Sequence, residues 1–169
     1  MALIQSIKGV KPKIPATCFL AQNATLVGDV TIGEHCSVWY NAVVRGDVNS
    51  IEIGNETNIQ DGAVIHCTYQ KAATKIGNRV SVGHKAIVHG CTIHDDVLIG
   101  MGAIVMDDAV IESGSIVAAG AIVTTGSRVE ANSIYAGIPA KKINTVSLEN
   151  SQMIKRTAKN YTKYKTWID

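Results

Sequence analysis

Aromatic side chains are scarce in this sequence: one Phe, two Trp and five Tyr make up 5% of its 169 residues. The hydrophobic fraction is nevertheless 46%, so small and β-branched aliphatic residues must fill the interior of a single domain. Such residues suit a narrow, regular core. Excess charge is also lacking, since the formal net charge is only +2. This argues against a nucleic acid partner.

Long apolar runs are missing as well. Residues 1–18 are interrupted by Lys8, Lys11 and Lys13 and so lack the apolar stretch of a signal peptide. No later stretch approaches the roughly 20 apolar residues of a membrane span. The four cysteines stand far apart without a C-x-x-C pair, which excludes conventional zinc-finger spacing. We therefore expect a cytoplasmic protein with reduced thiols and no membrane partner.

A six-residue repeat runs through most of the chain. A small or β-branched residue lies four positions after most aliphatic members of the series, and glycine often follows the aliphatic residue directly. This period fits neither an α-helix nor simple strand alternation, but it fits a short strand and a corner repeated. The aliphatic series, predicted to point inward, is Leu20, Leu26, Ile32, Val38, Val44, Ile53, Ile59, Ile65, Ile76, Val82, Val88, Ile93, Ile99, Val105, Ile111, Val117, Val123 and Val129.

Three such units in each coil would enclose a triangular prism, so residues 1–146 are predicted to form an all-β solenoid. From Ser147 onward the pattern changes to approximate helical spacing, with Ser147 as a plausible N-cap. We expect residues 147–169 to form a C-terminal α-helix packed on the solenoid. Its lysines predict a solvated outer face rather than contact with a membrane.

Interruptions of the repeat mark a functional face. Three extra residues stand between Val44 and Ile53, the segment Cys67–Lys75 is five residues too long, and the unit starting at Val88 is one residue short. Insertions in a solenoid emerge as loops, often on the binding face. Because these irregularities bracket several histidines, we expect the functional site there.

Counting units along the chain places three residues in one outward-facing column, one from each successive coil: Arg45, His66 and His89. Adjacent strands are about 4.8 Å apart, which allows His66 and His89 to share an ion with metal–nitrogen bonds of about 2.0–2.1 Å. Two histidines in register argue against ordinary solvated side chains. His35 and His94 lack such a partner and are expected to be solvated.

His84 and Asp61 share a column on the preceding face, which points away from His66 and His89 across a corner of the prism. One chain should therefore not bring all three histidines to one ion. They converge if a neighbouring copy supplies His84, and three-fold symmetry would repeat that contact and close the assembly. The sequence thus predicts a homotrimer with metal sites between subunits.

Two stretches, VVRGDVNSIEIGNETNIQDGAVIHC and VGHKAIVHGCTIHDDVLIGMGA, followed by YAGIPAKKI, resemble the γ-class carbonic anhydrases. The likeness covers about residues 10–145. It implies a left-handed parallel β-helix of hexapeptide repeats and a homotrimer. It also implies a catalytic metal held by His66 and His89 of one subunit and His84 of the next. Three imidazoles suit zinc, and iron or cobalt could also occupy them because affinity alone does not select the metal.

The resemblance implies roles for further residues. Arg45 and Asp47 look like the pair that orders the interface around the metal, and Gln60 and Asp61 look like groups that orient water or substrate. Tyr135 resembles a pocket tyrosine, although Gly137 replaces an asparagine of the family pattern.

The implied activity is that of a zinc-dependent carbonate dehydratase, a lyase that hydrates carbon dioxide reversibly to bicarbonate by means of a metal-activated hydroxide. The sequence departs from the family in the expected proton path, because Val48 replaces an acidic residue and the segment 67–75 has neither Asp nor Glu. This predicts weak or buffer-dependent activity.

Two other functions fit the same sequence. A hexapeptide-repeat acyltransferase or coenzyme A thioesterase would use one histidine as a general base without a metal. A non-catalytic trimer would hold a structural metal with no open coordination position. Convergence of all three histidines on one ion distinguishes the first of these from the metalloenzyme.

Overall fold

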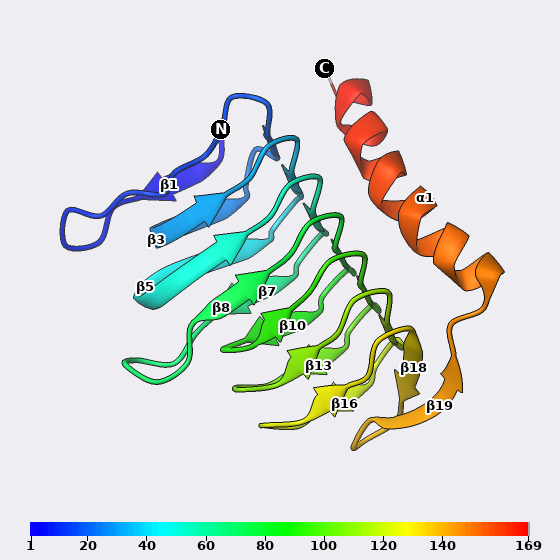
Figure 1. The fold of residues 1–169 in the computed structure, drawn as a ribbon. Coiled ribbons are helices and arrows are strands. Elements are labelled where there is room, and N and C mark those ends of the chain that lie inside the picture. Colours follow the sequence, from blue (N-terminus) through cyan, green and yellow to red (C-terminus); the bar gives the residue numbers. More distant parts are fainter. Residues whose placement is uncertain (169) are drawn as a thin grey trace.

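The structure is a computed structural model that describes residues 1–168, and it confirms the predicted fold class (Figure 1). Parallel strands stack coil upon coil into a left-handed β-helix with a single α-helix beside it. Most strands are only two or three residues long, because each face of the prism accommodates one short strand before the chain turns a corner.

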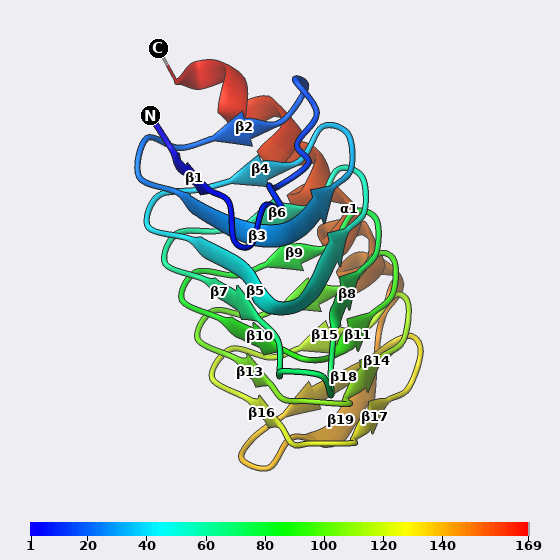
Figure 2. The ribbon, with the colours of Figure 1, turned by 90° about the vertical axis from the view of Figure 1, so that its left-hand side faces the viewer.

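Two faces of the prism belong to one 11-stranded sheet. They are joined because the long strands β3 (Thr25–Ile32) and β5 (Val43–Ile53) continue around a corner (Figure 2). The histidine face contains the first half of β5 with β7 (Val64–His66), β10 (Ile87–His89), β13 (Ile104–Val105) and β16 (Ile122–Val123). The polar face contains the second half of β5 with β8 (Thr74–Ile76), β11 (Thr92–Ile93), β14 (Val110–Ile111) and β17 (Arg128–Val129).

The third face, which we call the helix face, is an 8-stranded sheet. Its parallel strands are β2 (Phe19–Leu20), β4 (Ser37–Val38), β6 (Asn58–Ile59), β9 (Ser81–Val82), β12 (Leu98–Ile99), β15 (Ile116–Val117) and β18 (Ser133–Ala136). The last strand, β19 (Lys141–Thr145), runs antiparallel to β18. At the other end of the solenoid, β1 (Leu3–Gln5) pairs with β3.

The core consists of the predicted inward series. Every member from Leu26 to Val129 is buried, and Leu20 is half-buried in the first coil. Parallel registers such as Val44 to Ile65 and Ile65 to Val88 stack one aliphatic side chain directly on the next. Glycine is required where coils approach closely: a Cβ on Gly100 would lie 2.4 Å from the backbone nitrogen of Ala119.

The interruptions of the repeat have two structural outcomes. The extra residues between Val44 and Ile53 become part of β5, where the register with β3 shifts between Gly28 and Val30. The long segment after β7 instead projects as a loop (Figure 1), closed by an antiparallel bridge between Thr68 and Ala72.

The C-terminal helix α1 (Leu148–Tyr164) begins where predicted. The Ser147 hydroxyl accepts the backbone N–H of Asn150 and forms a capping box with it. The helix packs against the helix face and buries Ile154 and Ala158. A short 3-10 helix, η1 (Lys165–Trp167), follows.

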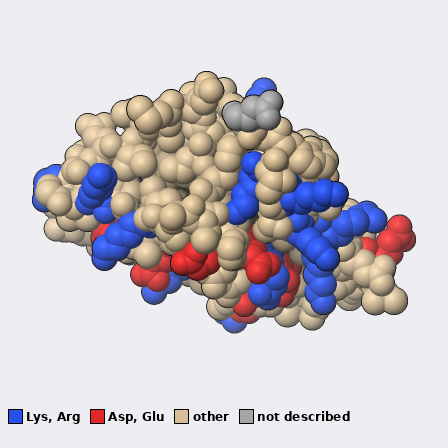
Figure 3. Space-filling view, turned by 90° about the horizontal axis from the view of Figure 1, so that it is seen from above, with Lys and Arg blue, Asp and Glu red and all other residues tan. Residues whose placement is uncertain are grey.

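On the side of the molecule that Figure 3 shows, blue Lys and Arg side chains gather mainly on the right, and red Asp and Glu side chains lie beside and below them. Among residues 1–168, no helix combines the length and the apolar character needed to cross a bilayer.

Replacing a member of the inward series should destabilise the whole stack. The side chain of Ile99 is 0% exposed, so Ile99→Ala should lower the free energy of unfolding by about 2–5 kcal/mol through lost burial and an unfilled cavity. Ile143→Ala, at a residue that is 64% exposed, should change it by less than about 0.5 kcal/mol. Urea unfolding at one fixed protein concentration measures both, and equal losses would contradict the assigned core.

Candidate metal centre

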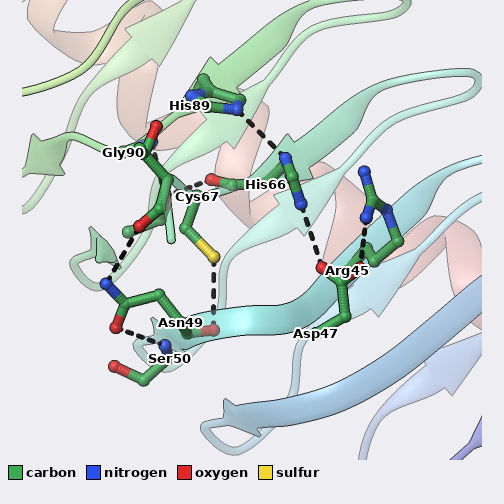
Figure 4. Close-up of polar contacts among 10 residues, drawn as sticks. Arg45, Asp47, Asn49, Ser50, His66, Cys67, His89 and Gly90 are labelled. Carbon is green, nitrogen blue, oxygen red and sulfur yellow. Dashed lines mark hydrogen bonds and ion pairs between the residues drawn. The ribbon is translucent and has the colours of Figure 1, made fainter. Parts of the chain in front are cut away.

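His66 and His89 lie at the ends of β7 and β10 as direct register partners. Because Ile65 and Val88 point into the core, strand alternation turns both imidazoles outward. Nδ1 of His66 lies 3.0 Å from Nε2 of His89 (Figure 4). The structure thus places these two histidines side by side in one outward column, next to Arg45 on β5.

Each of these imidazoles has a carboxylate at its other nitrogen. Nε2 of His66 lies 3.0 Å from Oδ1 of Asp47, and Nδ1 of His89 lies 2.5 Å from Oδ1 of Asp107. An ionised carboxylate can only accept, and a neutral imidazole has a single N–H. With both imidazoles neutral and each donating to its carboxylate, the two facing nitrogens are left as lone pairs. Two lone pairs at this distance call for a proton or a cation between them.

Both carboxylates are held in the ionised form. Burial raises the pKa of Asp47, but hydrogen bonds from His66 and from Arg45, whose Nη1 donates to Oδ2, outweigh it and leave the pKa lowered. Burial likewise raises the pKa of Asp107, but hydrogen bonds from Thr68 and His89 outweigh burial and leave the pKa lowered. The lowered pKa values keep both groups as acceptors at neutral pH, which fixes the imidazole tautomers.

His84 lies on the helix face, in the predicted column with Asp61. Its Nδ1 is 2.9 Å from Oδ2 of Asp61, so a third imidazole has a carboxylate beside one of its nitrogens. Within one copy of residues 1–168, no three His, Cys, Asp or Glu side chains gather closely enough to hold an ion. As the assignment of faces predicted, a single chain does not bring His84 to the other two histidines.

Gln60 is held by a ladder of polar side chains along the helix face. Its Nε2 donates to Oδ1 of Asn58 over 3.0 Å, and Nδ2 of Asn58 donates to Oγ of Ser81 over 2.8 Å. All three residues are buried. Gln60 and His84 line a groove of about 390 Å³ that apolar residues of the helix face and Tyr161 of α1 complete.

Tyr135 is not brought to this site. It follows Val129 by six residues and pairs with Val117 at the inward register position of β18. Its side chain packs against the core. Its strand β18 is separated from β9 by β15 and β12. The tyrosine that does lie beside His84 is Tyr161, whose pKa is raised to about 12 by burial and by the charge of Asp61.

Several residues at the site were not foreseen from the sequence. Asp107 is the main one. Thr74 donates its hydroxyl to the backbone oxygen of His66 over 2.5 Å and accepts the N–H of Gly90 over 2.9 Å. Cys67 donates its thiol to the backbone oxygen of Asn49 over 3.2 Å (Figure 4). These contacts tie β5, β7 and β10 together behind the histidines.

A family model described as bacterial transferase hexapeptide (six repeats) matches residues 90–125. The chain is 56% identical over 144 residues to a protein named probable carbonic anhydrase from Methanocaldococcus jannaschii, covering 85% of this chain and 90% of that protein. It is 41% identical over 155 residues to gamma carbonic anhydrase 2, mitochondrial, of Arabidopsis thaliana, covering 89% of this chain but only 56% of that longer protein.

Among solved structures, a hexapeptide transferase family protein from Anaplasma phagocytophilum matches with a TM-score of 0.95 and 41% identity. That match covers 99% of this chain and 98% of the other. The similarity therefore extends over the solenoid and the C-terminal helix alike.

The polar ladder beneath the groove should be sensitive to truncation. Asn58→Ala removes the partner of both Gln60 and Ser81 in a buried setting, which should cost about 1–3 kcal/mol of unfolding free energy. Asn144→Ala, on the exposed strand β19, is the matched control and should have little effect. Urea unfolding of the two variants gives the comparison, and an unaffected Asn58→Ala protein would show that the ladder does not hold Gln60.

Proposed function

Because this chain belongs to the γ-class carbonic anhydrase-like family of hexapeptide-repeat proteins, we propose that it is a metal-dependent carbonic anhydrase that interconverts carbon dioxide and bicarbonate. The observation that carries the proposal is that His66, His89 and His84 each have one ring nitrogen within 3.0 Å of a carboxylate oxygen. Metal-binding histidines characteristically donate their other N–H in this way, which orients the ring and raises its basicity.

The three imidazoles fit a divalent cation. Zinc suits three neutral nitrogen ligands with one position left open, and iron or cobalt also accept imidazole. Bound there, zinc would supply a Lewis acid strong enough to make water nucleophilic near neutral pH. The residues of the chain hold this arrangement: Arg45 and Asp47 orient His66, Asp61 orients His84, and Gln60 stands in the groove beside His84 for substrate or water.

The outward surface of the histidine face supports a homotrimer. Alongside the histidine column runs a ladder of partly exposed β-branched side chains in register: Val43, Val64, Ile87, Ile104 and Ile122. Ile87 is 36% exposed. The occupant we propose is the helix face of a second copy, whose groove offers apolar Leu98 and Met101 beside His84. Three such contacts close a ring with a metal site at each interface.

The side chains near the histidines support an activity that depends on buffer. Val48 and the segment 67–75 offer no carboxylate, and the two carboxylates beside the histidine pair are each bonded to an imidazole and kept ionised by lowered pKa values. Neither is poised to carry a proton at neutral pH. Turnover should therefore rely on a soluble base.

A reducing compartment suits the protein. All four cysteines are free thiols, and three of them are buried. Free thiols persist in compartments where cysteines are kept reduced, which supports the cytoplasm as the location.

An acyltransferase or thioesterase is the rival function. The His84–Asp61 pair beside an apolar groove has the composition of a general base next to an acyl site. Such an enzyme, however, needs one histidine and leaves the carboxylate partners of His66 and His89 unexplained. Stoichiometric metal in the purified protein distinguishes the two functions.

Mixing complementary variants tests whether the histidines come from two copies. His84→Ala and His66→Ala should each abolish bound metal. Because a mixed trimer retains one interface with all three ligands, random reassembly of equal amounts should restore about a quarter of the metal sites. Elemental analysis with solution mass measures this. No recovery in verified mixed trimers would mean that the ligands do not come from two copies.

Carbon dioxide hydration should be measured with and without added imidazole. Metal-loaded protein should show turnover that rises with imidazole concentration, because the buffer supplies the missing proton acceptor. The His89→Ala protein should show only the uncatalysed rate under both conditions. A metal-loaded trimer without hydration activity at any buffer concentration would leave the non-catalytic metal-binding trimer as the surviving interpretation.

A further inference from the structure

Asp107 has no counterpart in the motifs that indicate the metal ligands, yet it makes the shortest contact to His89. Its Oδ1 lies 2.5 Å from Nδ1 of His89, and its Oδ2 accepts the hydroxyl of Thr68 over 2.5 Å. Only 16% of its side chain is exposed. Both oxygens are thus engaged, one by the imidazole and one by the loop that follows β7.

Two irregularities of the solenoid meet on this carboxylate. The coil after Val88 is one residue short, since Val88 pairs with Val105, so Asp107 lies across from Gly90 and reaches His89 diagonally. Gly90 has φ +55°, and a Cβ there would lie 2.4 Å from Oδ1 of Asp107 and 2.9 Å from the Cβ of Ala72. The absent side chain at position 90 therefore provides the space that Asp107 occupies.

The inserted loop supplies the second support. Thr68 and Ala72 exchange backbone hydrogen bonds of 3.0 and 3.3 Å, and Asn49 donates its side-chain amide to the oxygen of Thr68 over 3.3 Å. These bonds fix Thr68 where its hydroxyl meets Asp107. The insertion and the deletion, which have no role in the repeat itself, act together at one carboxylate.

We infer that Asp107 is a positioning residue for the metal, oriented by Thr68 and given room by Gly90. The inference rests on the proposed function. Asp107 accepts the Nδ1–H of His89 and thereby fixes the tautomer whose Nε2 lone pair faces His66. A metal-ligating imidazole anchored in this way is more basic and pre-oriented, and loss of such a partner typically weakens metal binding 10–100-fold.

Zinc affinity of the assembled protein, measured by competition with a chromophoric chelator, tests this role. Asp107→Ala should weaken binding about 10–100-fold. Asp107→Asn keeps the shape and one acceptor oxygen without the charge and should fall between Asp107→Ala and the unaltered protein. The matched control is Asp108→Ala, since the Asp108 side chain is 52% exposed and lies 3.9 Å from Lys71 as its ion-pair partner. That control should leave the affinity unchanged.

Two spectroscopic measurements separate positioning from a general structural effect. In the cobalt-loaded protein, Asp107→Asn should shift the visible absorption bands, whereas Asp108→Ala should not. In metal-free protein, nitrogen NMR should find His89 protonated at Nδ1 and should find that preference lost in Asp107→Ala. Unchanged zinc affinity and an unchanged cobalt spectrum in a folded Asp107→Ala protein would overturn the inference.

Failure of the proposed function would look different. If the unaltered protein bound neither zinc nor cobalt, the metal centre itself would be wrong. The tautomer of His89 would still report on Asp107 in that case: the same tautomer in the unaltered protein and in Asp107→Ala would overturn the positioning role as well.

Discussion

Parallel stacking of successive coils is the constraint on which the rest of this structure depends. Each strand hydrogen bonds to the equivalent strand one coil away, so a residue's place in its six-residue unit decides whether it points inward or outward. Strand spacing of about 4.8 Å then brings outward residues of neighbouring coils within reach of one another. His66 and His89 meet for this reason, and so do Asp61 and His84.

That constraint explains why much could be predicted from the sequence. Periodicity alone identified the inward series, and counting along it placed His66 beside His89 and His84 on another face with Asp61. Asp107 was missed because the same counting leads from His89 to Met106; the actual contact is a diagonal that the short coil and Gly90 permit. The loop carrying Thr68 follows no repeat, so its hydrogen bonds could not be inferred from periodicity.

The position of Tyr135 shows a different limit of the sequence argument. The family resemblance suggests a pocket residue, and within one chain the structure places Tyr135 in register with Val117, packed against the core. The tyrosine beside His84 comes from α1, and no rule of the repeat relates a helix residue to a column of the prism. The pocket role of Tyr135 between two copies stays a prediction.

The antiparallel strand β19 has a consequence for the size of the molecule. A stack of parallel coils has no intrinsic end, because its last coil leaves backbone N–H and C=O groups unpaired and one more coil could bond to them. By folding back on β18 with a register shift between Ile134 and Tyr135, the chain presents a rung of opposite direction to any further copy. At the helix face the stack therefore ends in a strand that one more parallel coil could not continue in the same register.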